Sequence, residues 1–156
     1  MLNLREMTAG EYDGYRRFFI EEYARDLSGN HGYGIEKGRV NATRSINGYL
    51  PQGVDTPGHQ LYCIELAGDG RAAAVIGYLW VGWQGNTAFI SDFCILDAWR
   101  RRGYGKAALA LLDSRLSARG ITELGLRVAA DNPGARALYD RSGFRVTGVN
   151  MAKRIG

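Results

Sequence analysis

A basic and glycine-rich stretch holds the residues best suited to binding an anion: Arg100, Arg101, Arg102, Gly103, Tyr104, Gly105 and Lys106. The spacing of the residues that follow is helical, so this stretch lies where a strand ends and a helix begins. A helix N-terminus carries partial positive charge and free N–H groups, so arginines beside it are unfavourable unless an anion is bound. Glycines let the backbone turn sharply and approach a ligand. These features predict a polyphosphate site, and the alternative is a solvated basic run.

The glycine spacing is compatible with more than one kind of phosphate site. A P-loop requires the sequence Gly-x-x-x-x-Gly-Lys-Ser/Thr, which is absent. A dinucleotide-binding fingerprint fits better, because Gly103, Gly105 and Ala108 match its spacing and Glu123 lies about 20 residues beyond. However, Glu123 is expected at the start of the next strand, whereas a ribose would lie at a carboxyl end. Only about 50 residues follow Gly105, too few for the other strands of such a domain.

The elements around this stretch are readable from hydrophobic spacing and from turn residues. Thr8 and Glu11 form a capping box at the first helix, and Asn132 with Pro133 begins the last one. Three strand-like runs joined by short turns predict an antiparallel meander. The expected order is strand 2–7, helix from 8, a break at 29–34, helix 35–50, loop 51–58, strands 60–67, 72–83 and 87–96, helix 105–118, strand 122–129, helix 133–142 and one or two strands in 144–155. This order predicts one α/β domain (α+β, with a mixed sheet) over residues 1–156, with helices on both faces.

The composition limits the class of protein. The chain has 156 residues, 46% of them hydrophobic, and a formal net charge of +4, which suits either an anionic ligand or a nucleic acid. Cys63 and Cys94 lie in strand-like apolar runs and are expected to be free thiols. No cysteine and histidine cluster has metal-ligand spacing, so no metal is expected. Without a signal peptide or a membrane-spanning apolar run, the expected location is the cytoplasm.

A second set of residues follows the basic stretch after one helix and one strand: Asn132, Ala135, Leu138, Tyr139, Gly143 and Phe144. The pattern Arg100-x-x-Gly103-x-Gly105 resembles the Arg/Gln-x-x-Gly-x-Gly/Ala pyrophosphate motif of the GNAT acetyltransferase superfamily. The second set, in this order and spacing, resembles that family's second signature. The resemblance covers residues 87–147 and implies the GNAT fold, with splayed central strands and with acetyl-CoA as co-substrate.

The resemblance also implies roles for the matched residues. The strand before the basic stretch is expected to contain a bulge, and its backbone at Phe93 to Ile95 would bind the pantetheine arm and polarise the thioester carbonyl. The amides of residues 100–106 would bind the pyrophosphate. Asn132 would contact the pantetheine or cap its helix. Tyr139 would protonate the leaving thiolate, the alternative being a core aromatic residue.

The general base is the least determined residue of this site. Asp92 lies in an apolar strand beside the expected thioester position, so it is either functional or ion-paired. Glu65 and Tyr78 on neighbouring strands are alternatives, and His59 is a candidate for the substrate entrance. A chain of water molecules could also serve, in which case no single base exists.

Three functions are compatible with these residues. The first is transfer of acetyl from acetyl-CoA to a primary amine of a small molecule or peptide. The second is an acyl-CoA-binding or sensing domain without turnover, which the presence of Tyr139 with an intact loop argues against. The third is acetylation of aminoacyl-tRNA, which the absence of interleaved basic and aromatic residues disfavours. Segments 29–34 and 51–59 and the carboxylates Glu21, Glu22, Asp26 and Glu36 would select the unidentified amine. Whether the chain forms a homodimer stays open.

Overall fold

The computed structural model describes residues 1–32, 34–68, 70, 72–129 and 132–156, and the side chains of residues 30 and 31 are outside this description. The chain divides into two compact units. The first contains residues 1–12 and 52–127, and the second contains residues 13–51 and 128–156. Each unit is described by itself below.

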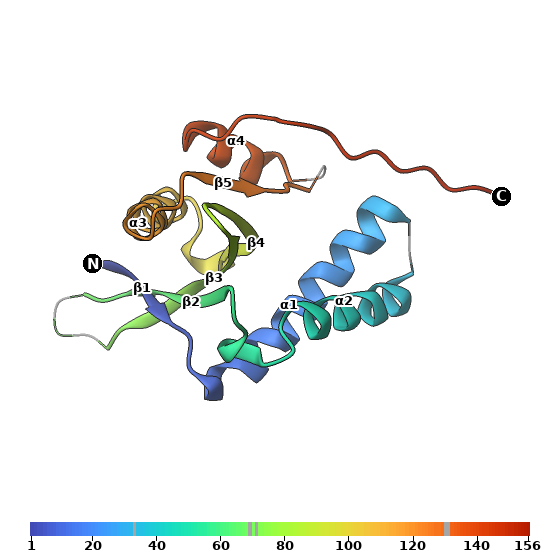
Figure 1. The fold of residues 1–156 in the computed structure, drawn as a ribbon. Coiled ribbons are helices and arrows are strands. Elements are labelled where there is room, and N and C mark those ends of the chain that lie inside the picture. Colours follow the sequence, from blue (N-terminus) through green and yellow to red (C-terminus); the bar gives the residue numbers. More distant parts are fainter. Residues whose placement is uncertain (33, 69, 71, 130–131) are drawn as a thin grey trace. The chain divides into compact units, whose positions relative to one another are not determined.

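The first unit is built on a five-stranded mixed sheet (Figure 1). Its strands follow the order of the sequence: β1 (Leu2–Glu6), β2 (His59–Leu66), β3 (Ala74–Gln84), β4 (Thr87–Ile95) and β5 (Glu123–Leu126). The first four strands pair antiparallel, and β4 pairs parallel with β5. The predicted meander is therefore confirmed, and the two residues between β3 and β4, Gly85 and Asn86, make the tight turn that their types favour. The predicted turn at 68–70 includes Asp69, which lies outside the described residues.

The strand β4 carries an extra residue and then separates from β5. Trp80 pairs with Asp92 whereas Val81 pairs with Ile90, so Ser91 is the additional residue of a β-bulge. The pairing between β4 and β5 ends at Ile90 and Leu126, although β4 continues to Ile95. The splayed central strands and the bulge that the family resemblance implies are therefore present.

One face of this sheet is covered by α3 (Tyr104–Ala118). Its apolar stripe, made of Ala108, Leu109, Leu112 and Leu116, is buried as the sequence predicts. Figure 1 shows α3 beside the sheet, and the guanidinium carbon of Arg115 lies 5.2 Å from the centre of the Tyr62 ring on β2. The other α-helices belong mainly to the second unit. The expectation that helices also cover the opposite face of the sheet therefore stays a prediction.

The second unit contains a helical hairpin made by α1 (Ala9–His31) and α2 (Ile35–Tyr49). The first turn of α1 lies in the first unit, where the amide of Thr8 donates to Glu11 and completes the predicted capping box. The two helices touch closely, because a Cβ on Gly38 would lie 2.8 Å from the carbonyl oxygen of Ala24. The loop after α2 includes a short 3-10 helix, Gly53–Asp55. The predicted break at 29–34 includes Tyr33, which is outside the described residues.

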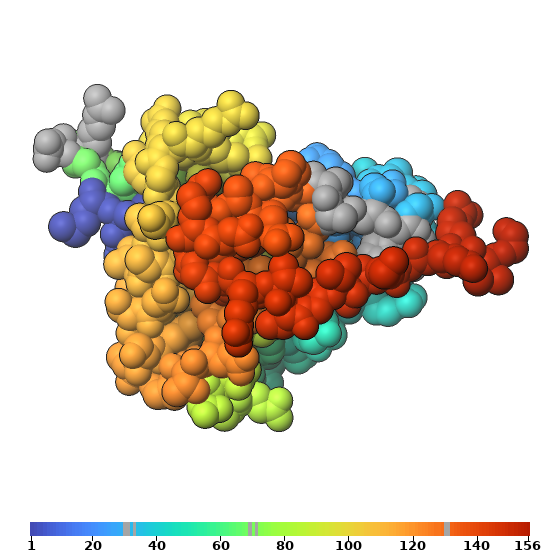
Figure 2. All heavy atoms as spheres, turned by 90° about the horizontal axis from the view of Figure 1, so that it is seen from above, coloured from blue at the N-terminus to red at the C-terminus, as the bar shows by residue number. Residues whose placement is uncertain are grey.

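The second unit ends with α4 (Pro133–Arg141) and a long extended segment. The Asn132 side chain accepts a hydrogen bond from the amide of Ala135 at 3.0 Å, which confirms the predicted N-cap. The prediction of one or two closing strands in 144–155 is wrong, because the structure assigns no strand to residues 145–156. These residues run as an exposed extended chain (Figures 1 and 2). Alternating sequence alone does not make a strand, which exists only where the backbone pairs with a neighbour.

Candidate functional site

The basic stretch forms a turn between β4 and α3 that contains two left-handed backbone conformations. Arg101 has φ 64° and Gly103 has φ 81° and ψ 4°. Glycine adopts this conformation readily, whereas an arginine in it carries backbone strain of about 1 kcal/mol or more. Strained residues cluster at ligand-binding positions, and turns with alternating backbone handedness direct successive N–H groups toward one point. The geometry therefore suits an anion.

The helix that follows adds its own donors to this turn. The first intrahelical bond of α3 runs from the amide of Ala107 to the carbonyl of Gly103. The amides of Tyr104, Gly105 and Lys106 precede it, and helix geometry gives them no intrahelical acceptor. The first turn of α3 contains no acidic residue, so no side chain of this turn offsets the partial positive charge of the helix N-terminus. That charge favours an external anion.

The three arginines do not play equal parts in the turn. The Arg100 side chain turns back, with Nε 2.7 Å from the carbonyl oxygen of Ile95 and Nη1 2.7 Å from Asp97. Its amide also donates to the carbonyl of Asp97. Arg100 therefore fixes the shape of the turn, whereas the exposed side chains of Arg101 and Arg102 extend its positive surface. The guanidinium of Arg102 lies 5.6 Å from the centre of the Trp99 ring.

The end of β4 places backbone groups beside this turn. Asp92, Phe93 and Ile95 pair with Trp80, Leu79 and Gly77 on β3, and all three are half-buried. The last pair of β4 with β5 is Ile90 with Leu126, so β4 runs on past the end of its pairing with β5.

Two further candidates, Asn132 and Tyr139, lie in the second unit. The Tyr139 side chain is 9% exposed, and its ring meets the ring of Phe144 edge-on with centres 5.6 Å apart. Asn132 uses its side-chain oxygen as a helix cap. Their assembly with the turn of the first unit into one site stays a prediction.

The alternative bases Glu65 and Tyr78 lie near an ion-pair network that the sequence did not reveal. Arg5 donates from Nε to Glu65 at 2.7 Å, and its other nitrogens donate to both carboxylate oxygens of Glu11 at 2.8 and 2.9 Å. The bonds from Arg5 lower the pKa of Glu11 to about 2. Glu65 is thus engaged in an ion pair, which disfavours it as a base. Burial raises the pKa of Tyr78, which keeps its phenol protonated.

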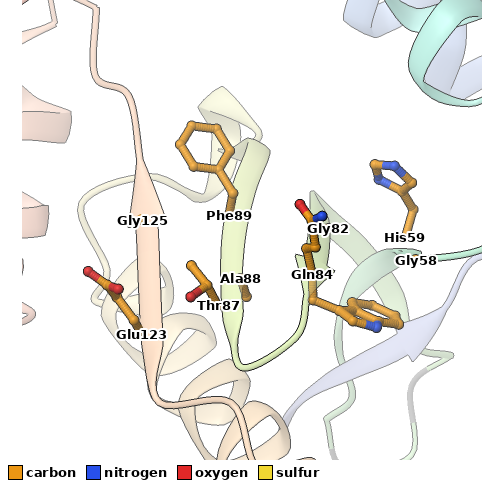
Figure 3. Close-up of a pocket in the computed structure, with 10 residues that line it drawn as sticks. Gly58, His59, Gly82, Gln84, Thr87, Ala88, Phe89, Glu123 and Gly125 are labelled. Atoms are coloured by element: carbon orange, nitrogen blue, oxygen red, sulfur yellow. The ribbon is translucent and has the colours of Figure 1, made fainter.

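His59 lines a cavity of about 560 Å³ at the other end of β4 (Figure 3). Its Nδ1 accepts a hydrogen bond from Nε1 of Trp80 at 3.0 Å, and burial lowers its pKa. Phe89, Gln84 and Glu123 also line this cavity. One sequence feature points to this cavity: Gly82 and Gly125 interrupt strands, where glycine marks a close approach or an open space.

Two other kinds of site are not found among the described residues. No group of three or more His, Cys, Asp or Glu side chains within the described ranges is arranged to hold a metal ion. None of the helices in the described part of the chain is long and apolar enough to cross a membrane.

Cys63 and Cys94 are free thiols, as the sequence predicts, and burial raises the pKa of Cys63 to about 11.

Comparison with known proteins identifies the family. The model of the Acetyltransferase (GNAT) family matches residues 21–144, which include the basic turn, β4, β5 and α4. The chain belongs to the GNAT acetyltransferase family. The fold class expected from the sequence, a mixed α/β sheet with splayed central strands, agrees with this membership.

Individual relatives extend the similarity over nearly the whole chain. The uncharacterized N-acetyltransferase YycN of Bacillus subtilis is 31% identical over 97% of both chains, and YdgE of the same organism is 26% identical over 97% of both. The crystal structure of YycN superposes with a TM-score of 0.90 over 99% of both chains. The structure of AAC(6')-Iy, in complex with a CoA-containing bisubstrate analogue, shares the fold at 14% identity, with a TM-score of 0.61 over 100% of this chain and 99% of its own.

Proposed function

We propose that this GNAT family member transfers an acetyl group from acetyl-CoA to a primary amine, in the cytoplasm. The observation that carries the proposal is the turn before α3. There, two left-handed residues, the first amides of α3 and the exposed side chains of Arg101 and Arg102 lie within a few positions of one another in the chain. A pyrophosphate would satisfy the amides, the helix dipole and the arginines together. The CoA-containing ligand of AAC(6')-Iy agrees with this assignment.

The end of β4, beyond its last pair with β5, is the proposed binding position of the thioester. A pantetheine arm that leaves the turn would meet the backbone of Phe93 and Ile95, where β5 has separated from β4. When bound, acetyl-CoA supplies an acyl group whose carbonyl is activated by backbone hydrogen bonds. The bulge at Ser91 redirects the strand at this point, which is a common use of a bulge beside an active site.

Two side chains are the proposed proton carriers. Asp92, half-buried next to the bulge, is the candidate base that receives the proton from the attacking amine, directly or through water. Tyr139, whose hydroxyl group can donate a hydrogen bond, is the candidate acid that protonates the departing thiolate. In direct attack, the new C–N bond forms as the C–S bond breaks, and no covalent intermediate on the protein is required.

Isothermal titration calorimetry with acetyl-CoA tests the coenzyme site. Gly103→Asp would introduce a side chain at φ 81° and a negative charge within the turn, so we expect a loss of affinity of tenfold or more. Gly68→Ala, which has nothing within 4 Å of the added Cβ, is the matched control. Unchanged affinity in Gly103→Asp would refute the pyrophosphate assignment.

A second experiment measures the release of free coenzyme A from acetyl-CoA in the presence of different amines. It tests whether the protein turns over and which amine is the acceptor.

A further inference from the structure

A row of four residues across the sheet forms the floor of the cavity in Figure 3. His59 on β2 pairs with Gly82 on β3, Gly82 pairs with Phe89 on β4, and Phe89 pairs with Gly125 on β5. Directly paired residues point to the same face of a sheet, so two rings alternate with two glycines along this row. The cavity measures about 560 Å³, which is the size of a small-molecule site.

The two glycines leave room for the rings that lean over them. A Cβ on Gly82 would lie 3.0 Å from Nδ1 of His59, and a Cβ on Gly125 would lie 3.4 Å from the Phe89 ring. Because neighbouring strands are roughly 5 Å apart, His59 and Phe89 stand about 10 Å apart across Gly82. The Phe89 side chain is 49% exposed, although it lies within a strand. The row is therefore a slot with an aromatic wall on each side.

The hydrogen bond to Trp80 determines what His59 can offer to a ligand. Nδ1 accepts from the Trp80 indole at 3.0 Å, so in the neutral imidazole the proton is on Nε2. His59, a lining residue of the cavity, then has a hydrogen-bond donor at Nε2 rather than a base. A ligand that uses it must carry a hydrogen-bond acceptor. The exposed carboxylate of Glu123, also part of the lining, disfavours a ligand that is negatively charged there.

We propose that this slot binds the non-reacting end of the acceptor, and that this end is an uncharged aromatic ring with a hydrogen-bond-accepting substituent. A flat ring fits between the imidazole, which leans over Gly82, and the Phe89 ring, which leans over Gly125. Phe89 then offers an offset or edge-on contact, and Nε2 of His59 donates to the substituent. The inference rests on the proposed acetyl transfer for its reacting end. The slot lies at Thr87–Phe89, where β4 begins, whereas the coenzyme turn follows its other end at Ile95. An acceptor placed this way would approach the thioester along β4 without competing with the coenzyme.

Calorimetry with hydroxyphenylalkyl amines tests the slot, with straight-chain alkyl amines of equal length as matched ligands. Each series is titrated with and without saturating coenzyme A. We expect the wild-type protein to bind the aromatic series twofold to tenfold more tightly than the alkyl series. Phe89→Leu keeps apolar volume but removes the ring, and Gly125→Ala narrows the slot, so both should remove this preference. Equal affinity for the two series in the wild-type protein would overturn the proposal.

The variants also separate this proposal from the proposed function. Coenzyme affinity should be the same in Phe89→Leu, Gly125→Ala and the control Gly68→Ala, because none of them alters the turn before α3. His59→Phe should lower the affinity for the hydroxyphenyl series more than for unsubstituted phenylalkyl amines, and an equal loss for both would contradict the donor role of Nε2. If coenzyme A does not bind the wild-type protein, the proposed function fails, while the titrations without coenzyme still decide whether the slot prefers a ring.

Discussion

The indole Nε1 of Trp80 donates a 3.0 Å hydrogen bond to Nδ1 of His59, with the two ring centres 5.9 Å apart. Trp80 is almost fully buried, at 1% exposure, so the donor is fixed in position. This one contact sets the tautomer of a histidine that faces the cavity. It also opposes protonation, since a proton on Nδ1 would meet the indole N–H.

Trp80→Phe should raise the pKa of His59 toward its ordinary value, because the donor that occupies Nδ1 is removed. In the wild-type protein the lowered pKa means that the unfolded chain binds the proton first, so His59 reduces stability as the pH falls below about 6.5. NMR titration of the histidine Cε1–H signals measures the shift, and His31→Asn assigns the two signals. An unchanged His59 pKa in Trp80→Phe would show that the hydrogen bond has no influence on protonation.

Tyr139→Phe should lower kcat by about tenfold to a thousandfold, with little change in the KM for acetyl-CoA, if the phenol protonates the thiolate. The ring contact with Phe144 does not need the hydroxyl, so the fold of α4 should be kept. Steady-state kinetics with an accepted amine gives both constants, and circular dichroism checks the fold. Wild-type turnover in the variant would exclude the acid role.

Arg101→Gly should have opposite effects on stability and on coenzyme binding. Glycine relieves the left-handed backbone at φ 64°, so the folded state should gain up to about 1 kcal/mol. Loss of the exposed guanidinium should weaken coenzyme A binding severalfold, and more so at low salt. Chemical denaturation and calorimetry measure the two quantities. Arg17→Ala on α1 is the control for removal of a positive charge. Arg119 is not suitable for this purpose, because its guanidinium packs over the Trp83 ring.

Gly77→Ala should destabilise the protein by about 1–3 kcal/mol. A Cβ at this position would overlap the carbonyl oxygen of Cys94, so the pairing of β3 with β4 must shift. The affected part of β4 includes Phe93 and Ile95, so coenzyme binding should weaken as well. Denaturant unfolding compares this variant with Gly68→Ala, for which we expect a change within about 0.5 kcal/mol. Equal stability of the two variants would contradict the close approach of these strands.

Glu11→Gln should make the free energy of unfolding depend less on pH in the acidic range. Arg5 holds the pKa of Glu11 at about 2 in the folded state, against 4.5 ordinarily. Its contribution is therefore present above pH 4.5 and is lost as the pH falls toward 2. The side chain is 34% exposed, so after solvent screening we expect about 1–2 kcal/mol. Unfolding free energies across this pH range, with Glu22→Gln on the exposed side of α1 as control, should show a shallower slope for Glu11→Gln.

Much of the fold followed from local sequence. The capping box at Thr8, the N-cap at Asn132 and the apolar stripe of α3 each depend on residues within a few positions of one another. Such interactions form wherever the segment is placed, so periodicity and turn chemistry predict them. The closing strands in 144–155 were wrongly predicted for the opposite reason, since a strand needs a partner that its own sequence does not supply.

The sequence by itself determined the order of the elements from β1 to α4, the family resemblance and the position of the basic turn between β4 and α3. The tertiary structure decided what those positions can do. It put Arg5 beside Glu65 and aligned His59, Gly82, Phe89 and Gly125 across four strands. These relationships depend on register between segments far apart in the chain, and a shift of one residue would move each side chain to the other face.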